Sequence, residues 1–185
     1  EIAIIEMGAN HIGEIEFMSS IAQQDEGLIT NIGKAHLEGF GSLEGVRIGK
    51  TELYKYLDKT FGTLFFNQGD SKLVQSLPAN TTNINYSKDE AEDVSNYPFV
   101  GFKYEGMYLQ SHLSGAYKLV NMIAALSVVR YFEVPSHLLK AGIENYVPAN
   151  NRSELMKTEH NTLILDAYNA NPSSMAESIK NFGNH

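Results

Sequence analysis

Short apolar runs alternate with amphipathic segments in the N-terminal part of the chain, and this alternation restricts the fold more than any other feature. The run "EIAIIEMG" at residues 1–8 predicts a buried strand, "EIEFMSSIAQ" from Glu14 predicts a helix, and "GLITNIG" from Gly27 predicts a second strand. Strand, helix and strand in this order are typical of a parallel sheet with crossover helices. Residues 63–67, "TLFFN", continue the pattern as a further strand followed by a short helix. We therefore expect an α/β domain with a mostly parallel sheet and flanking helices.

The middle of the chain predicts a different arrangement. Residues 78–98 are polar and rich in turn-forming residues, which indicates surface loops and an edge strand. An antiparallel hairpin that turns near Glu105 and Gly106 is expected next. Two helices should follow, "AYKLVNMIAALSVVRYF" from Ala116 and "SHLLKAGIENY" from Ser136.

The stretch "VPANNRSE" has the composition of a linker, because it contains a proline and asparagines and little apolar surface. After it, "TLILDAYNANPSSMAESIKNF" begins again with strand, loop and helix. The sequence therefore predicts one domain over residues 1–148, followed by the start of a second α/β domain over residues 149–185.

Composition excludes several classes of protein. The chain has 185 residues and a formal net charge of −8, with 14 basic against 22 acidic side chains. Nucleic-acid binding normally depends on clustered Lys and Arg, so we expect no nucleic-acid partner. No apolar run reaches the roughly 18 residues of a membrane helix, so we expect no membrane insertion and a cytoplasmic location. Because the chain contains no cysteine, disulfides and a cysteine nucleophile are excluded.

Three residues that suit a metal-bound phosphate centre fall near one edge of the predicted sheet. Ligands of parallel sheets sit beyond the carboxyl ends of the strands, which is where Glu6 and the loop containing His36 are expected. Carboxylate and imidazole groups bind divalent cations, and Mg²⁺ adds water and phosphate oxygens. Lys50, on the helix predicted from Ser42, is a cation as a free amine. Reaction with carbon dioxide would convert it to an anionic carbamate. Taken alone, each residue is more simply explained as a surface side chain.

A second group of polar residues lies further along the chain. Asn121 falls inside the apolar run "LVNMIAAL", so it should need a hydrogen-bond partner or a ligand. Arg152, in the linker, has a planar guanidinium that suits phosphate. Asp166 ends the strand "TLILD", which places a carboxylate at the ligand edge of a sheet. A backbone-bonded Asn121 and a solvent-exposed Arg152 are the plain alternatives.

Two motif-based alternatives find little support. Gly49, Lys50 and Thr51 resemble the end of a phosphate-binding P-loop, but Glu44 stands where that motif requires glycine. No other P-loop and no G-x-G-x-x-G motif occurs in the chain. A zinc hydrolase that uses His11 and His36 is a further alternative, and no HExxH spacing supports it.

The segments "EMGANHIGEI", "NIGKAHLEGFGS", "GKTEL", "NNRSE" and "LDAYNANPSSM" together resemble the Mur ligase family. The resemblance covers nearly the whole chain and is weakest between Leu73 and Leu113. Within the family, it is closest to the ligases that add D-alanyl-D-alanine. It implies the central ATPase domain of such a ligase without its P-loop segment, followed by the first strand and helix of the next domain.

The resemblance also implies an activity, which is ATP-dependent amide ligation in the synthesis of the peptidoglycan precursor. Family members of this type join D-alanyl-D-alanine to a UDP-muramoyl-tripeptide through an acyl phosphate and use Mg²⁺. Such an enzyme is expected to be a monomer in the cytoplasm. The roles carried over by position are magnesium ligation by Glu6, His36 and carbamylated Lys50; catalysis by Lys50 and His36; and ATP binding by Asn121, Arg152, Asp166 and Asn169. Asn10 also falls in a matching motif.

The sequence departs from the family pattern at several places. Lys118 stands where the family usually has asparagine. The chain opens without an initiator Met, and the family's P-loop and N-terminal domain lie upstream of the Glu6 segment, so we expect a fragment that neither ligates nor hydrolyses ATP alone. Two alternatives stay open, a degenerate nucleotide-binding or scaffolding domain and a folylpolyglutamate-type ligase. The "DAYNANP" loop disfavours the second of these.

Overall fold

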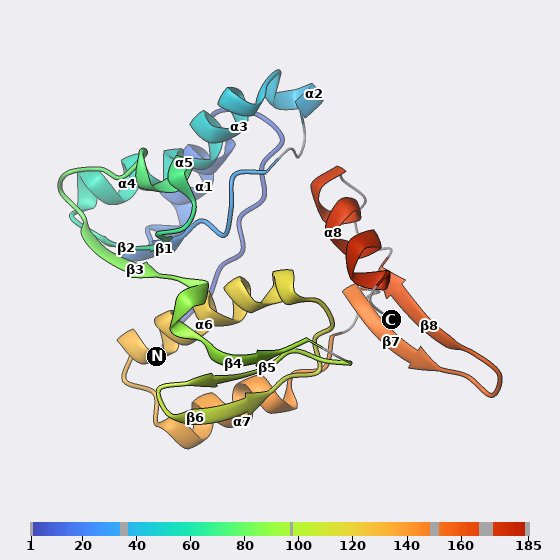
Figure 1. Ribbon diagram of the computed structural model, residues 1–185. Coiled ribbons are helices and arrows are strands. Elements are labelled where there is room, and N and C mark those ends of the chain that lie inside the picture. Colours follow the sequence, from blue (N-terminus) through green and yellow to red (C-terminus); the bar gives the residue numbers. More distant parts are fainter. Residues whose placement is uncertain (1, 34–36, 97, 149–151, 167–171, 184–185) are drawn as a thin grey trace. The chain divides into compact units, whose positions relative to one another are not determined.

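The chain folds into two compact units, Glu1–Tyr86 and Ser87–His185, and each unit is considered separately. The computed structural model, drawn in Figure 1, describes residues 2–33, 37–96, 98–148, 152–166 and 172–183. The domain boundary predicted near residue 148 stays a prediction. In the described ranges no helix has the length and apolar character needed to span a membrane.

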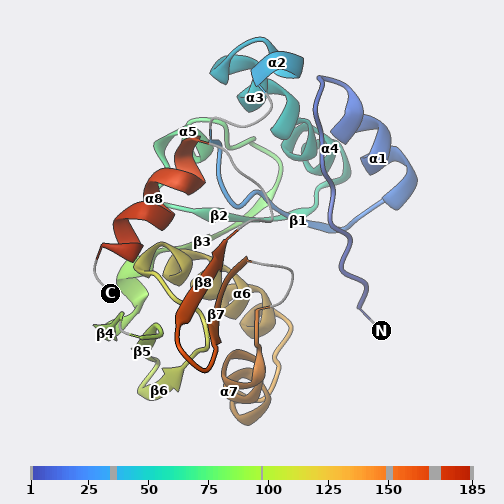
Figure 2. The ribbon, with the colours of Figure 1, turned by 90° about the vertical axis from the view of Figure 1, so that its right-hand side faces the viewer.

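A three-stranded parallel sheet forms the base of the first unit. Its strands are β1 (Glu26–Leu28), β2 (Thr63–Asn67) and β3 (Thr82–Tyr86), in the order β1-β2-β3. The first four residues of the central strand β2 are buried, as expected for an apolar strand with neighbours on both sides. Figures 1 and 2 show the helices of this unit gathered on one side of the three strands.

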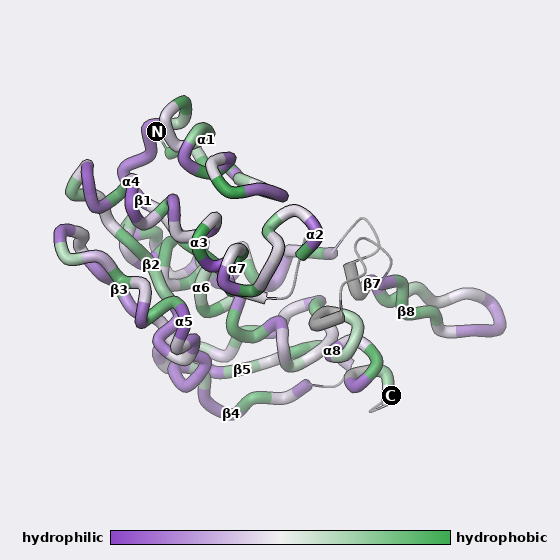
Figure 3. Tube along the Cα trace, turned by 90° about the horizontal axis from the view of Figure 1, so that it is seen from above, coloured by the Kyte–Doolittle hydropathy of each residue, from purple (hydrophilic) through white to green (hydrophobic). Residues whose placement is uncertain are grey.

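Five helices are described in the first unit. Their bounds within the described residues are α1 Glu14–Ala22, α2 Leu37–Phe40, α3 Leu43–Lys50, α4 Glu52–Thr60 and α5 Ser71–Val74. Two of them, α3 and α5, begin at a side-chain cap. The hydroxyl of Ser42 accepts a hydrogen bond from the Gly45 N–H at 3.0 Å, which caps α3 as predicted. Along α1, hydrophilic and hydrophobic residues alternate, as the tube in Figure 3 shows.

The core of the first unit lies between the helices and the sheet. Val46 of α3, Leu57 of α4 and Leu64 of β2 are fully buried there. The buried members of this cluster are Ile29, Ile32, Phe40, Val46, Tyr54, Leu57, Leu64, Phe66 and Leu73. The sheet and its helical cover confirm the predicted α/β class with a parallel sheet and flanking helices.

An antiparallel sheet and two helices open the second unit. The strands are β4 (Glu92–Ser95), β5 (Gly101–Tyr104) and β6 (Met107–Gln110). Glu105 and Gly106 connect β5 to β6 with φ values of 47° and 80°, so both are left-handed, as a tight two-residue hairpin turn requires. The hairpin predicted at this point is confirmed.

The predicted helices of the second unit are also present. They are α6 (Leu119–Tyr131) and α7 (Ser136–Asn145); short 3₁₀ turns occur at η1 (Lys88–Glu90) and η2 (Ala116–Lys118). The last elements are the antiparallel pair β7 (Arg152–Lys157) and β8 (Thr162–Asp166), and the helix α8 (Pro172–Phe182).

The first predicted strand is wrong in this structure. Residues 2–9 have no regular secondary structure, and the side chains of Ile2, Ile4 and Ile5 are 58%, 91% and 58% exposed. A strand is stabilised by hydrogen bonds to a neighbouring strand, and within the described residues β1 pairs only with β2. The segment has the apolar composition of a strand, but among the described residues no neighbouring strand pairs with it.

Three further boundaries differ from the prediction. The second strand is short and begins at Glu26, while the helix predicted from Ser42 is interrupted at Thr51 and forms α3 and α4. Thr51, between the two helices, has φ −76° and ψ 2°, and its hydroxyl donates to the Arg47 carbonyl at 2.8 Å. The predicted linker is shorter than expected, because strand β7 already begins at Arg152.

Candidate functional site

Lys50 is the last residue of α3, and its amine reaches the chain beyond the carboxyl end of β1. The Nζ group donates a hydrogen bond to the Asn31 carbonyl at 2.8 Å, and the residue is half-buried. Burial lowers the pKa of the Lys50 amine below its ordinary value, and the nearby carboxylate of Asp70 partly opposes this effect. The lowered pKa favours the neutral amine, which is the form that can add to carbon dioxide.

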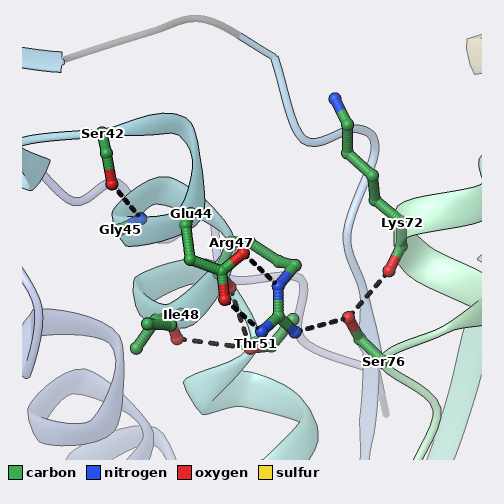
Figure 4. A network of polar contacts seen from close by, with 8 residues as sticks. All are labelled: Ser42, Glu44, Gly45, Arg47, Ile48, Thr51, Lys72 and Ser76. Atoms are coloured by element: carbon green, nitrogen blue, oxygen red, sulfur yellow. Dashed lines mark hydrogen bonds and ion pairs between the residues drawn. The ribbon is translucent and has the colours of Figure 1, made fainter.

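A network of polar contacts holds α3 against α5 (Figure 4). The guanidinium of Arg47 donates to the carboxylate of Glu44 at 2.8 Å and to the Ser76 hydroxyl at 3.1 Å. That hydroxyl donates in turn to the Lys72 carbonyl at 2.7 Å. The backbone that carries Lys50 is thereby fixed to the segment that follows β2.

A second lysine reaches the same stretch of backbone. The amine of Lys72, on α5, donates to the Ile32 carbonyl at 3.2 Å, next to the carbonyl that Lys50 contacts. Two amines thus lie at the edge of the sheet where ligands of parallel α/β domains bind. Lys72 was not predicted from the sequence, although its place in the short helix that follows β2 is a signal that topology could have supplied.

The loop from Asn10 to Gly13 packs close to α2. The carboxylate of Glu14 accepts hydrogen bonds from the backbone N–H groups of Asn10 at 2.6 Å and His11 at 3.1 Å. These bonds lower the pKa of Glu14, and the bond from the Asn10 N–H has the largest effect. Gly39 of α2 lies so near that a Cβ there would be 2.2 Å from the Asn10 carbonyl oxygen. Segments "GANH" and "LEGF" are thereby brought together.

Replacing Gly39 with alanine is expected to lower the free energy of unfolding by about 1–3 kcal/mol, because the new methyl group forces the Asn10 backbone away. Chemical denaturation followed by circular dichroism measures this change. Gly142→Ala, in α7, is the matched control, since a Cβ there meets nothing within 4 Å. Equal effects of the two substitutions would contradict the close packing of the loop on α2.

The predicted metal ligands are only partly described. Glu6 is solvent-exposed in the irregular N-terminal segment. His36 lies outside the described residues, so its approach to Lys50 stays a prediction. Among the residues that the structure describes, no group of three or more His, Asp or Glu side chains is placed to hold a metal ion. His11, named in the zinc alternative, has its Nδ1 atom 3.1 Å from the carboxylate of Glu14.

The predicted nucleotide contacts lie in the second unit. Asn121 is exposed on α6, whereas its neighbour Met122 is buried, so the amide is open to solvent or to a ligand. The amine of Lys118 lies 5.1 Å from the centre of the Tyr117 ring. The role of Asn121 in binding adenine stays a prediction.

The hairpin of β7 and β8 brings two of the predicted residues together. Arg152 and Asp166 are paired positions at one end of this ladder, and Asp166 is half-buried at the end of its strand as predicted. Residues so paired lie side by side across the two strands. Asn169 lies outside the described residues.

A parallel sheet with flanking helices defines this molecule as an α/β domain, the class in which ligands bind beyond the carboxyl ends of the strands. The chain belongs to the Mur ligase middle domain family, whose model matches residues 1–129. It is 32% identical to the UDP-N-acetylmuramoyl-tripeptide–D-alanyl-D-alanine ligase of Bacillus subtilis (strain 168), in an alignment that covers 97% of this chain and 41% of that protein. The chain thus spans about two fifths of the length of this relative.

Solved structures show the same fold. A crystal structure of MurF from Acinetobacter baumannii superposes with a TM-score of 0.85 at 26% identity, over 98% of this chain and 42% of that one. MurF from Thermotoga maritima in complex with ADP gives a TM-score of 0.78 at 23% identity, over 94% of this chain and 42% of that one. At that identity the second likeness concerns the fold alone.

Proposed function

We propose that the full-length protein containing this chain is an ATP-dependent ligase that joins D-alanyl-D-alanine to a UDP-muramoyl-tripeptide in the cytoplasm. The observation that carries the proposal is the match of 97% of the chain to a relative that bears this name. A second observation supports it, namely two lysine amines at the ligand edge of the parallel sheet. ATP and the UDP-linked peptide are both anionic. The Lys72 amine can attract such groups directly, and Lys50 can do so through a carbamate that binds Mg²⁺.

The surroundings of the Lys50 amine support a carbamate at this position. The neutral amine adds to the carbon of carbon dioxide, one proton leaves, and the product is an anionic carboxylate that keeps one N–H. That N–H can still donate to the Asn31 carbonyl, which Lys50 already contacts at 2.8 Å. We propose that this carboxylate, Glu6 and His36 hold Mg²⁺, which neutralises phosphate oxygens when ATP reacts.

The residues proposed to contact the nucleotide belong to the second unit. We propose that Arg152 contacts phosphate, Asp166 binds the ribose, and Asn121 and Asn169 contact the remainder of ATP. The pairing of Arg152 with Asp166 across β7 and β8 supports a shared ligand, because neighbouring groups can contact adjacent parts of one nucleotide. Both residues then act by positioning ATP for phosphoryl transfer.

A ligation assay of the full-length protein tests the function. With ATP, Mg²⁺, D-alanyl-D-alanine and UDP-muramoyl-tripeptide, we expect phosphate release that depends on the dipeptide and an amide product identified by mass spectrometry. The 185-residue chain alone should show no ATP turnover. Ligation of glutamate instead would indicate a folylpolyglutamate-type enzyme. Nucleotide binding without any ligation would indicate a binding or scaffolding domain.

The carbamate has its own test, which does not depend on turnover. Full-length protein in isotope-labelled bicarbonate at neutral to alkaline pH is expected to show a carbamate carbon signal by NMR, and Lys50→Arg should remove it. Lys59→Arg is the matched control, since the Lys59 side chain is 72% exposed and its amine lies 3.8 Å from Glu16. Persistence of the signal in Lys50→Arg would contradict a carbamate on Lys50.

A further inference from the structure

Glu52 is a buried carboxylate that caps a helix distant from it in the sequence. The residue is 5% exposed, and its Oε1 atom accepts a hydrogen bond from the Gly13 N–H at 2.6 Å. Its Oε2 atom accepts one from the Glu16 N–H at 3.1 Å. Both oxygens therefore bind backbone groups at the N-terminus of α1, where unpaired N–H groups and the helix dipole favour a negative charge.

The position of Glu52 in the chain links this cap to the proposed metal site. Lys50 ends α3, Thr51 lies between the two helices, and Glu52 is the first residue of α4. A displacement of the Glu52 backbone would therefore be transmitted to Lys50 through two peptide units. On the other side of the contact, Gly13 ends the Asn10–Gly13 loop, which follows the segment that carries Glu6.

The same loop is held from two other directions. The carboxylate of Glu14 binds the N–H groups of Asn10 and His11, and Gly39 of α2 lies against the Asn10 carbonyl. Of these contacts, only that of Glu52 joins the loop to the helix junction beside Lys50. Its partners lie 39 and 36 residues away in the sequence.

We propose that Glu52 is a positioning residue of the ligase, which holds the Asn10–Gly13 loop, and with it the segment carrying Glu6, in register with Lys50. This inference rests on the proposed function. The two bonds to backbone N–H groups offset the cost of burying the carboxylate, and they tie the start of α1 to the start of α4. Because Glu52 stands two residues after Lys50, the same tie joins the loop that follows Glu6 to the end of α3.

The substitution Glu52→Gln in the full-length protein tests the proposal. Glutamine has the same length, but its amide nitrogen faces one of the two backbone N–H groups and cannot accept from it. Hydrogen exchange of the Gly13 and Glu16 amides is expected to accelerate about tenfold or more. The Mg²⁺ concentration for half-maximal ligation should rise about 10–100-fold, while the KM for D-alanyl-D-alanine stays unchanged.

Two companion variants make the outcome decisive. Glu16→Gln removes a charge from the same region of α1. The Glu16 side chain is 68% exposed, and its ion pair with the Lys59 amine, at 3.8 Å, is weak. Neither the hydrogen exchange of the Gly13 amide nor the Mg²⁺ dependence of ligation should therefore change. Glu52→Asp keeps the negative charge on a shorter side chain, so its Mg²⁺ dependence and amide exchange should lie between those of wild type and Glu52→Gln. This variant supplies the test if Glu52→Gln folds poorly. A lower melting temperature with unchanged Mg²⁺ dependence would overturn the proposal and leave Glu52 a structural cap.

The two proposals fail in different ways. If the wild-type protein does not ligate, the proposed function is wrong. The positioning role is then wrong as well, even if slow exchange of the Gly13 and Glu16 amides shows that Glu52 caps α1. If the wild-type protein ligates and Glu52→Gln matches it in Mg²⁺ dependence, only the positioning role is wrong.

Discussion

Replacing Lys50 with methionine in the full-length protein is expected to lower the ligation rate by about 10²–10³-fold or more, without lowering the melting temperature. The rate falls because methionine cannot form a carbamate and so removes a proposed metal ligand. Stability is retained because methionine fills similar space and removes a half-buried amine whose pKa burial has lowered. Initial rates of phosphate release and thermal denaturation measure the two effects.

The lowered pKa of Lys50 also predicts how stability changes with pH. Because the folded-state pKa of Lys50 lies below the ordinary lysine value of 10.5, the unfolded chain binds more protons between the two values. The free energy of unfolding of wild type should therefore rise, relative to Lys50→Met, as pH increases toward 10.5. Denaturation in carbonate-free buffer at several pH values measures this difference.

Lys59→Met is the control for both measurements. Its side chain is 72% exposed, so neither rate nor stability should change appreciably. Full activity of Lys50→Met would contradict the role of Lys50 in the proposed site. A relative stability of wild type that falls with rising pH would contradict the lowered pKa.

Replacing Leu57 with alanine is expected to lower the free energy of unfolding by about 3–5 kcal/mol. Leu57 is fully buried in α4. Its methyl groups fill the space beside two glycines, since a Cβ at Gly27 or Gly62 would lie 2.7 Å or 2.6 Å from them. No side chain at either glycine can move into the cavity that alanine leaves. The loss is a large part of the roughly 5–15 kcal/mol that stabilises an ordinary domain.

Chemical denaturation of both variants measures this effect against a surface control. Ile21→Ala, on α1, removes an isoleucine side chain that is 68% exposed, and its effect should stay within about 0.5 kcal/mol. Similar losses for Leu57→Ala and Ile21→Ala would contradict the placement of Leu57 in the core between α4 and the sheet.

Local patterns predicted much of the fold. The strand at Thr63–Asn67, the cap of α3 at Ser42 and the hairpin turn at Glu105 agree with the structure. Each depends on residues within a few positions of one another, such as a hydroxyl three residues from the N–H that it binds. Local chemistry is sufficient in such cases.

The segment at residues 1–8 shows where local patterns are insufficient. Its composition is that of a strand, yet strand formation needs a neighbour, and the structure gives it none among the described residues. The exposure of Asn121 was similarly unpredictable, because its apolar neighbours do not show which side of α6 faces the core.

Sequence alone determined the α/β class, the family motifs and the candidate residues, since these depend on residue type and short spacing. Only the tertiary structure decided which groups meet. Lys50 contacts a carbonyl 19 residues away, and Glu52 binds amides 36 and 39 residues away. Such contacts form when helices pack on the sheet and bring distant parts of the chain together. A local sequence pattern does not show which buried polar atoms will then need a hydrogen-bond partner.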